Sequence, residues 1–125
     1  MTKTSFHILR VGVAITFLWI GVLIFKNPES WGGYLQPWAV KLLAVDIKTA
    51  MVATAVFDII IGFSFLVNYL TFWASLLASF HLIIVMTVSG INPITARDLG
   101  LLAGTLALAF NSFYYESIKS KQHHS

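Results

Sequence analysis

Four long apolar stretches, separated by short polar breaks, constrain this chain more than any other feature of its 125 residues. A helix needs about 20 apolar residues to cross a bilayer, and each stretch is long enough for one crossing. The sequence therefore predicts an all-α integral membrane four-helix bundle. The expected crossings run from about Phe6 to Phe25, Thr49 to Leu70, Thr71 to Gly90, and Thr95 to Tyr115.

The composition supports a membrane protein with one domain. Hydrophobic residues make up 58% of the chain and charged residues only 10%, whereas an ordinary soluble domain is about 25% charged. We expect residues 1–115 to form a single transmembrane domain and residues 116–125 a disordered polar tail. The first apolar run ends at Lys26 without a small-residue cleavage site, which favours a retained helix over a signal peptide.

The charged and sulfur-containing residues exclude several function classes. Eight Lys and Arg face five Asp and Glu, and these charges are scattered along the chain, so no nucleic-acid partner is expected. The chain has no cysteine, which removes disulfides, thiol redox chemistry and iron–sulfur clusters. His123 and His124 stand next to each other, but no cysteine or well-placed carboxylate accompanies them, so no metal site is expected.

The connection from Lys26 to Lys48 is the longest between two crossings. It carries Trp31, Tyr34 and Trp38, and such amphipathic rings typically anchor a chain at the membrane interface. Within it, the apolar spacing from Ala39 to Ile47 predicts a short interfacial helix. A solvent-exposed loop is the alternative.

Local signals also predict how the helices begin and pack. The second and third stretches form a hairpin, because one continuous helix would be twice the bilayer length. Thr95 and Asp98 have the spacing of a capping box at the start of the fourth helix. Gly62, Gly100 and Gly104 let helix backbones approach closely, and we expect them to pack within the chain more than between two copies.

Two ionisable residues lie near the middle of predicted crossings. Asp58 is in the second and His81 in the third, each about a dozen residues from the hairpin turn. Because a helix rises 1.5 Å per residue, the two side chains are expected at similar depth. The pair has three possible roles: a proton relay, a hydrogen-bonding site for a quinone, or a polar clasp between two helices.

Arg10 lies one turn inside the first crossing. Its side chain has two possible positions, since it either extends inward to pair with Asp58 or snorkels toward the headgroups. His7 and His81 are at different depths, so a haem held by two histidines is not expected.

Three segments resemble the DoxX-like family of small four-helix membrane proteins. They are Leu9-Arg10 with Gly21 and Lys26 beyond, residues 56–62 (VFDIIIG), and residues 97–104 (RDLGLLAG). Asp58 stands where relatives often have Glu, and the first connection is longer and richer in Trp. The resemblance implies a bundle associated with redox complexes, such as a subunit of a thiosulfate:quinone oxidoreductase. It places Arg10, Asp58, Arg97 and Asp98 at polar positions typical of the family.

From these features we expect a small accessory subunit of a quinone-linked membrane oxidoreductase or respiratory complex. Asp58, His81 and Arg10 would line a quinone or proton site, with quinone or lipid as a non-covalent ligand and other membrane subunits as partners. A purely structural subunit and a stand-alone carrier or proton-coupled transporter are the alternatives. We expect a prokaryotic plasma membrane with both termini in the cytoplasm.

Overall fold

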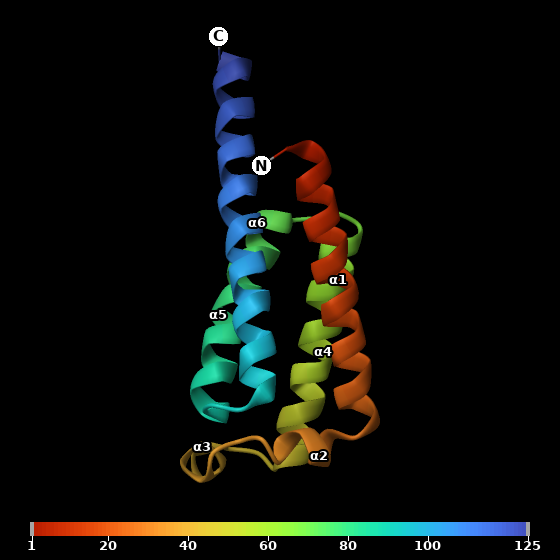
Figure 1. Ribbon diagram of the computed structural model, residues 1–125, viewed down its shortest axis with the longest axis vertical. Helices are drawn as coiled ribbons and strands as arrows, with labels where there is room; N and C mark the ends of the chain where they lie inside the picture. Colours follow the sequence, from red (N-terminus) through yellow and green to blue (C-terminus); the bar gives the residue numbers. More distant parts are fainter. Residues whose placement is uncertain (1, 125) are drawn as a thin grey trace.

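The computed structural model describes residues 2–124, with side chains described for residues 2–114. The fold is all-α, and four long helices form an elongated bundle (Figure 1). Two short helices join the first long helix to the second. The elements are α1 (Lys3–Lys26), α2 (Pro28–Gly32), α3 (Pro37–Leu42), α4 (Ile47–Leu66), α5 (Thr71–Ser89) and α6 (Pro93–His124).

The four long helices are each long and apolar enough to cross a membrane, so the protein is an integral, multi-pass membrane protein. Both termini lie at one end of the bundle and α2 and α3 at the other (Figure 1). We call these ends the terminal face and the α2–α3 face. The spanning part of α6 is Pro93–Tyr114, and the helix continues to His124. The prediction of a disordered tail from residue 116 is therefore wrong for the backbone, while its side chains, including His123 and His124, lie outside the described residues.

The bundle consists of two tightly packed helix pairs, α1 with α4 and α5 with α6, whereas α4 and α5 touch little. Glycines allow the first pair to approach closely. A Cβ atom on Gly21 would come within 2.9 Å of the Ala55 carbonyl oxygen, and one on Gly62 within 2.9 Å of the Leu18 backbone nitrogen. The second pair is joined by a 2.8 Å hydrogen bond between the hydroxyls of Ser79 and Thr105.

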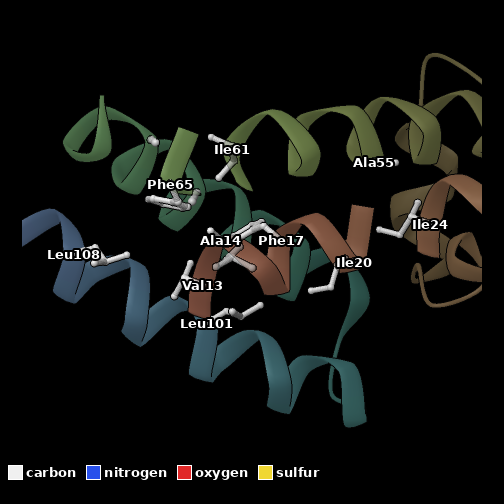
Figure 2. Packing of buried hydrophobic residues seen from close by; sticks show 13 residues of the cluster. Val13, Ala14, Phe17, Ile20, Ile24, Ala55, Ile61, Phe65, Leu101 and Leu108 are labelled. Atoms are coloured by element: carbon white, nitrogen blue, oxygen red, sulfur yellow. The ribbon is translucent and has the colours of Figure 1, made fainter. Parts of the chain in front are cut away.

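The apolar core lies between the pairs (Figure 2), and its largest fully buried apolar side chains lie toward the terminal face. Phe17, Phe65 and Leu108 are at most 1% exposed. The Phe17 and Phe65 rings pack with centroids 6.1 Å apart. Large side chains fill this half of the bundle, so the two helix pairs are held together there without a direct α4–α5 seam.

The predicted interfacial helix between α1 and α4 has different bounds in the structure. Helix α3 covers Pro37–Leu42, not Ala39–Ile47. The residue after it, Leu43, has an extended backbone that ends the helix. Asp46 instead caps α4, because its Oδ1 accepts a 2.8 Å hydrogen bond from the Thr49 backbone N–H. Pro37 favours the first turn of α3, and Asp46 serves as the N-cap of α4. The short helix therefore begins and ends closer to the N-terminus than predicted.

The predicted capping box at Thr95 and Asp98 is wrong. Helix α6 begins two residues earlier, at Pro93, and Asn92 caps it by accepting hydrogen bonds from the backbone N–H groups of Ile94 and Thr95 at 2.8 and 3.0 Å. The Thr95 hydroxyl donates to the Gly90 carbonyl oxygen. Asn followed by Pro supplies a cap and a first helical residue, which leaves Asp98 free for another role.

Candidate functional site

A cavity of about 410 Å³ lies between the helix pairs on the α2–α3 side of the core. This volume is typical of small-molecule sites. Phe17, Leu82 and Leu101 line its inner end, and all three are buried. Trp31, Tyr34 and Trp38, the predicted interfacial anchors, line it toward the α2–α3 face. The cavity therefore combines apolar walls with an aromatic rim at the α2–α3 face.

Asp58 and His81 meet at this cavity from opposite helix pairs. The Nε2 atom of His81 lies 3.4 Å from Oδ1 of Asp58, as the matched depths in α4 and α5 predict. Asp58 is 4% exposed, and the His81 side chain is 20% exposed. The Phe57 ring packs against the His81 ring at 4.6 Å between centroids, which fixes the orientation of the imidazole.

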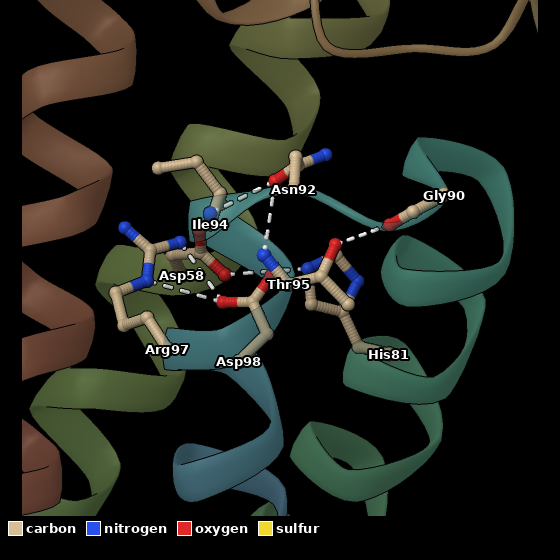
Figure 3. Close-up of polar contacts among 8 residues, drawn as sticks. All are labelled: Asp58, His81, Gly90, Asn92, Ile94, Thr95, Arg97 and Asp98. Atoms are coloured by element: carbon tan, nitrogen blue, oxygen red, sulfur yellow. Dashed lines mark hydrogen bonds and ion pairs between the residues drawn. The ribbon is translucent and has the colours of Figure 1, made fainter.

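Arg97 and Asp98 form a second charged pair in the same cavity. Arg97 donates from Nη2 and Nε to Oδ1 of Asp98 at 2.9 and 3.2 Å, and Asp98 is 2% exposed. The Arg97 guanidinium also lies over the Trp31 ring, 5.8 Å from its centroid. Figure 3 shows the carboxylates of Asp58 and Asp98 close together, with Arg97 on one side and His81 on the other.

The sequence gives a signal for this second pair that the capping-box interpretation concealed. An adjacent Arg and Asp within a spanning segment are costly in lipid and face the bundle interior. Starting the helix at Pro93 places both one turn inside the span, where they require internal partners. The resemblance marks both positions as polar, but it assigns them no contact with Asp58.

Arg10 does not belong to this site. Its Nη1 atom donates to the backbone carbonyl oxygens of Phe65 and Leu66, at 2.5 and 2.9 Å, and its Nε donates to Nδ1 of His7 at 3.3 Å. Arg10 therefore holds the C-terminal end of α4 at the terminal face. The structure therefore contradicts the pairing of Arg10 with Asp58, which was one of its two expected positions.

The three glycines predicted to pack helices have different surroundings. Gly62 faces the α1 backbone, as described above, and a Cβ on Gly104 would lie 3.4 Å from Val13 Cγ2, an ordinary contact with α1. A Cβ on Gly100 would meet nothing within 4 Å. Packing within the chain therefore explains Gly62 and, weakly, Gly104, but the prediction is wrong for Gly100.

The four ionisable side chains define what the cavity can do chemically. Arg97 balances the charge of Asp98, so Asp58 and His81 remain as a pair that can hold and release one proton between them. A neutral imidazole also offers a hydrogen bond to a ligand carbonyl. Among the described residues, no three His, Asp or Glu side chains gather in a group that would hold a metal ion.

These observations come from the chain itself. No protein-family model, no curated protein and no solved structure matches the chain.

Proposed function

We propose that this protein binds a quinone in its cavity and acts as a small DoxX-like subunit of a quinone-linked membrane oxidoreductase or respiratory complex. The observation that carries this proposal is the Asp58–His81 contact in the wall of an apolar cavity at membrane depth. A quinone has the matching chemistry, because it is flat and apolar with two hydrogen-bond-accepting carbonyls.

The pair supplies what quinone reduction needs from a protein. Reduction of a quinone to a quinol consumes two electrons and two protons, one on each carbonyl oxygen. In this proposal His81 donates a hydrogen bond and then a proton to one carbonyl oxygen, and Asp58 orients the imidazole and returns a proton to it. Water supplies the proton for the other carbonyl oxygen. The chain has no cysteine to bind an iron–sulfur cluster, so in this proposal a partner subunit supplies the electrons.

Binding is tested by quenching of tryptophan fluorescence in purified protein reconstituted into nanodiscs. Trp19 and Trp73 are more than 60% exposed and do not line the cavity, so they are replaced by Phe to leave Trp31 and Trp38 as reporters. A short-tailed ubiquinone and a short-tailed menaquinone are titrated separately. We expect saturable quenching by at least one of them.

The carboxylate is then tested with a matched pair of variants. Asp58→Asn removes one carboxylate from the cavity, and Asp46→Asn makes the same change outside it while keeping a good helix cap. Asp58 orients the imidazole that donates to the quinone, and a hydrogen bond to a charged group contributes about 1.5–3 kcal/mol. Because Asp58→Asn loosens that orientation, we expect it to weaken binding about tenfold or more. Asp46→Asn should leave Kd unchanged. Equal affinity in all three proteins would reduce the pair to a helix clasp.

The subunit role has a separate test. Membranes containing the protein at native abundance are solubilised in mild detergent, and the native-gel band is identified by mass spectrometry. Stoichiometric redox subunits in that band would support the proposal. Migration as the isolated chain or its homo-oligomer would contradict the subunit role and favour a carrier. We also propose cytoplasmic termini in a prokaryotic plasma membrane, which a reporter fused to the C-terminus checks.

A further inference from the structure

We propose that the cavity is a dead-end pocket that opens only onto the α2–α3 face, with Arg97 as the charge at its mouth. Ligand and protons would then reach Asp58 and His81 from one side of the membrane alone. The inference rests on the proposed function for the role of the pair, but the access route itself follows from packing and is tested without any quinone.

The inner end of the cavity is closed by two layers of buried side chains. Phe17, Leu82 and Leu101 line the cavity and are 1%, 4% and 9% exposed. Behind them, Phe65 and Leu108 are completely buried. This apolar plug separates Asp58 from the terminal face, where Arg10 is bound to the end of α4.

Buried polar side chains between His81 and the terminal face bond within the α5–α6 pair. The hydroxyls of Ser79 and Thr105 bond to each other at 2.8 Å, and the Ser75 hydroxyl donates to the Thr71 carbonyl oxygen at 2.6 Å. All four residues are at most 8% exposed. These groups are satisfied within the α5–α6 pair, so their role is packing.

The opposite end of the cavity is accessible and carries the charge of Arg97. The Arg97 side chain is 33% exposed and lies over Trp31 of α2. Tyr34 and Trp38 on the rim are 42% and 48% exposed. The charged groups around Asp58 are His81 on α5 and Arg97 and Asp98 on α6 (Figure 3), and of these Arg97 contacts α2 at the rim. In this proposal an incoming group passes the guanidinium before it reaches the pair.

Single-cysteine variants test the direction of access, because the natural chain contains no thiol. Thr54→Cys and Met51→Cys place a thiol on the α4 wall of the cavity. Lys48→Cys marks the α2–α3 face, and Tyr69→Cys, in the turn between α4 and α5, marks the terminal face. Each variant is treated with a membrane-impermeant methanethiosulfonate, either in intact spheroplasts or in inverted vesicles.

We expect both cavity thiols to react from the side that labels Lys48→Cys and to be protected from the side that labels Tyr69→Cys. Ser79→Cys, within the plug, should react from neither side. Two cavity positions are used so that a folding defect in one variant leaves the other informative. Labelling of the folded cavity variants from the Tyr69 side, from both sides or from neither would overturn the proposal.

The position of Arg97 at the mouth is tested by charge selectivity. The labelling rates of Thr54→Cys with an anionic and a cationic methanethiosulfonate are compared in three backgrounds: natural Arg97, Arg97→Met and Arg97→Lys. Removing a positive charge within several ångströms of the path should lower the anionic-to-cationic rate ratio at least about threefold, and lysine should restore it. An unchanged ratio in Arg97→Met would place the opening elsewhere.

The two proposals fail in distinguishable ways. Single-sided labelling without quinone quenching would retain the dead-end pocket and reject the quinone. Saturable quenching with labelling from both faces would retain the ligand and reject the one-sided access.

Discussion

The Nε2 atom of His81 and Oδ1 of Asp58, 3.4 Å apart, join two helix pairs that otherwise touch little along α4 and α5. The contact lies where the cavity separates the pairs. It therefore joins the halves of the bundle at a point where the His81 side chain is still 20% exposed.

The contribution of the Asp58–His81 contact to the free energy of unfolding is expected to be small. Polar contacts between membrane helices average about 0.6 kcal/mol in double-mutant cycles. A cycle of Asp58→Asn, His81→Gln and the double variant should give a coupling free energy of that size. Unfolding by SDS in mixed micelles, followed by helix circular dichroism, measures it. A coupling above about 2 kcal/mol would identify the pair as mainly a helix clasp.

Gly62 and Gly100 should respond oppositely to the same substitution. A Cβ on Gly62 would lie 2.9 Å from the Leu18 backbone nitrogen and 3.0 Å from the Ala14 carbonyl oxygen, so α1 must shift. Overpacking of this kind costs about 1–3 kcal/mol. We expect Gly62→Ala to lower the free energy of unfolding by that amount. Gly100→Ala, in open space, should be neutral or stabilising, and equal losses would refute the packing described for α1 and α4.

Arg10 should stabilise the bundle without affecting ligand binding. Its guanidinium donates to carbonyl oxygens at the C-terminal end of α4, where a cation contributes up to about 2 kcal/mol in a partly buried setting. Arg10→Met keeps much of the side-chain length and should lower the unfolding free energy accordingly. The quinone Kd should stay at the natural value. A large loss of quinone affinity in a folded Arg10→Met protein would show that Arg10 contributes to the site.

The N-cap of α4 predicts a dependence of stability on acid pH. Hydrogen bonding from the side chain and then the backbone N–H of Thr49 holds the pKa of Asp46 below its ordinary value of 3.8. Because the folded-state pKa is the lower one, the stabilisation is complete above the unfolded-state pKa and disappears as the pH falls through the folded-state pKa.

Thermal unfolding of the natural protein and of Asp46→Asn, measured between pH 7 and pH 2, checks this dependence. Asparagine keeps the cap but does not titrate. The Tm difference between the two proteins should be constant from neutral pH down to the ordinary Asp range, and should then shift against the natural protein with further acidification. A difference that stays constant over the whole range would show that the cap does not depend on the Asp46 charge.

The sequence by itself determined the all-α architecture, the four crossings and the depth of Asp58 and His81. Hydropathy fixes which segments enter the bilayer, because unpaired polar groups are costly there. A constant rise per residue then fixes depth once the hairpin turn is located. Membrane insertion and residue depth each depend on one or two neighbouring segments, so both can be predicted from the linear sequence.

Only the tertiary structure decided which helix faces meet. The rotation of each helix about its axis depends on packing against all its neighbours, and this rotation brings Arg97 and Asp98 into the cavity while leaving Gly100 in open space. The same packing takes Arg10 to the end of α4. It also pairs α4 with α1 instead of with its sequence neighbour α5, because the glycine contacts allow closer approach there. Because α4 pairs with α1 and not with α5, space remains between the two helix pairs for the cavity.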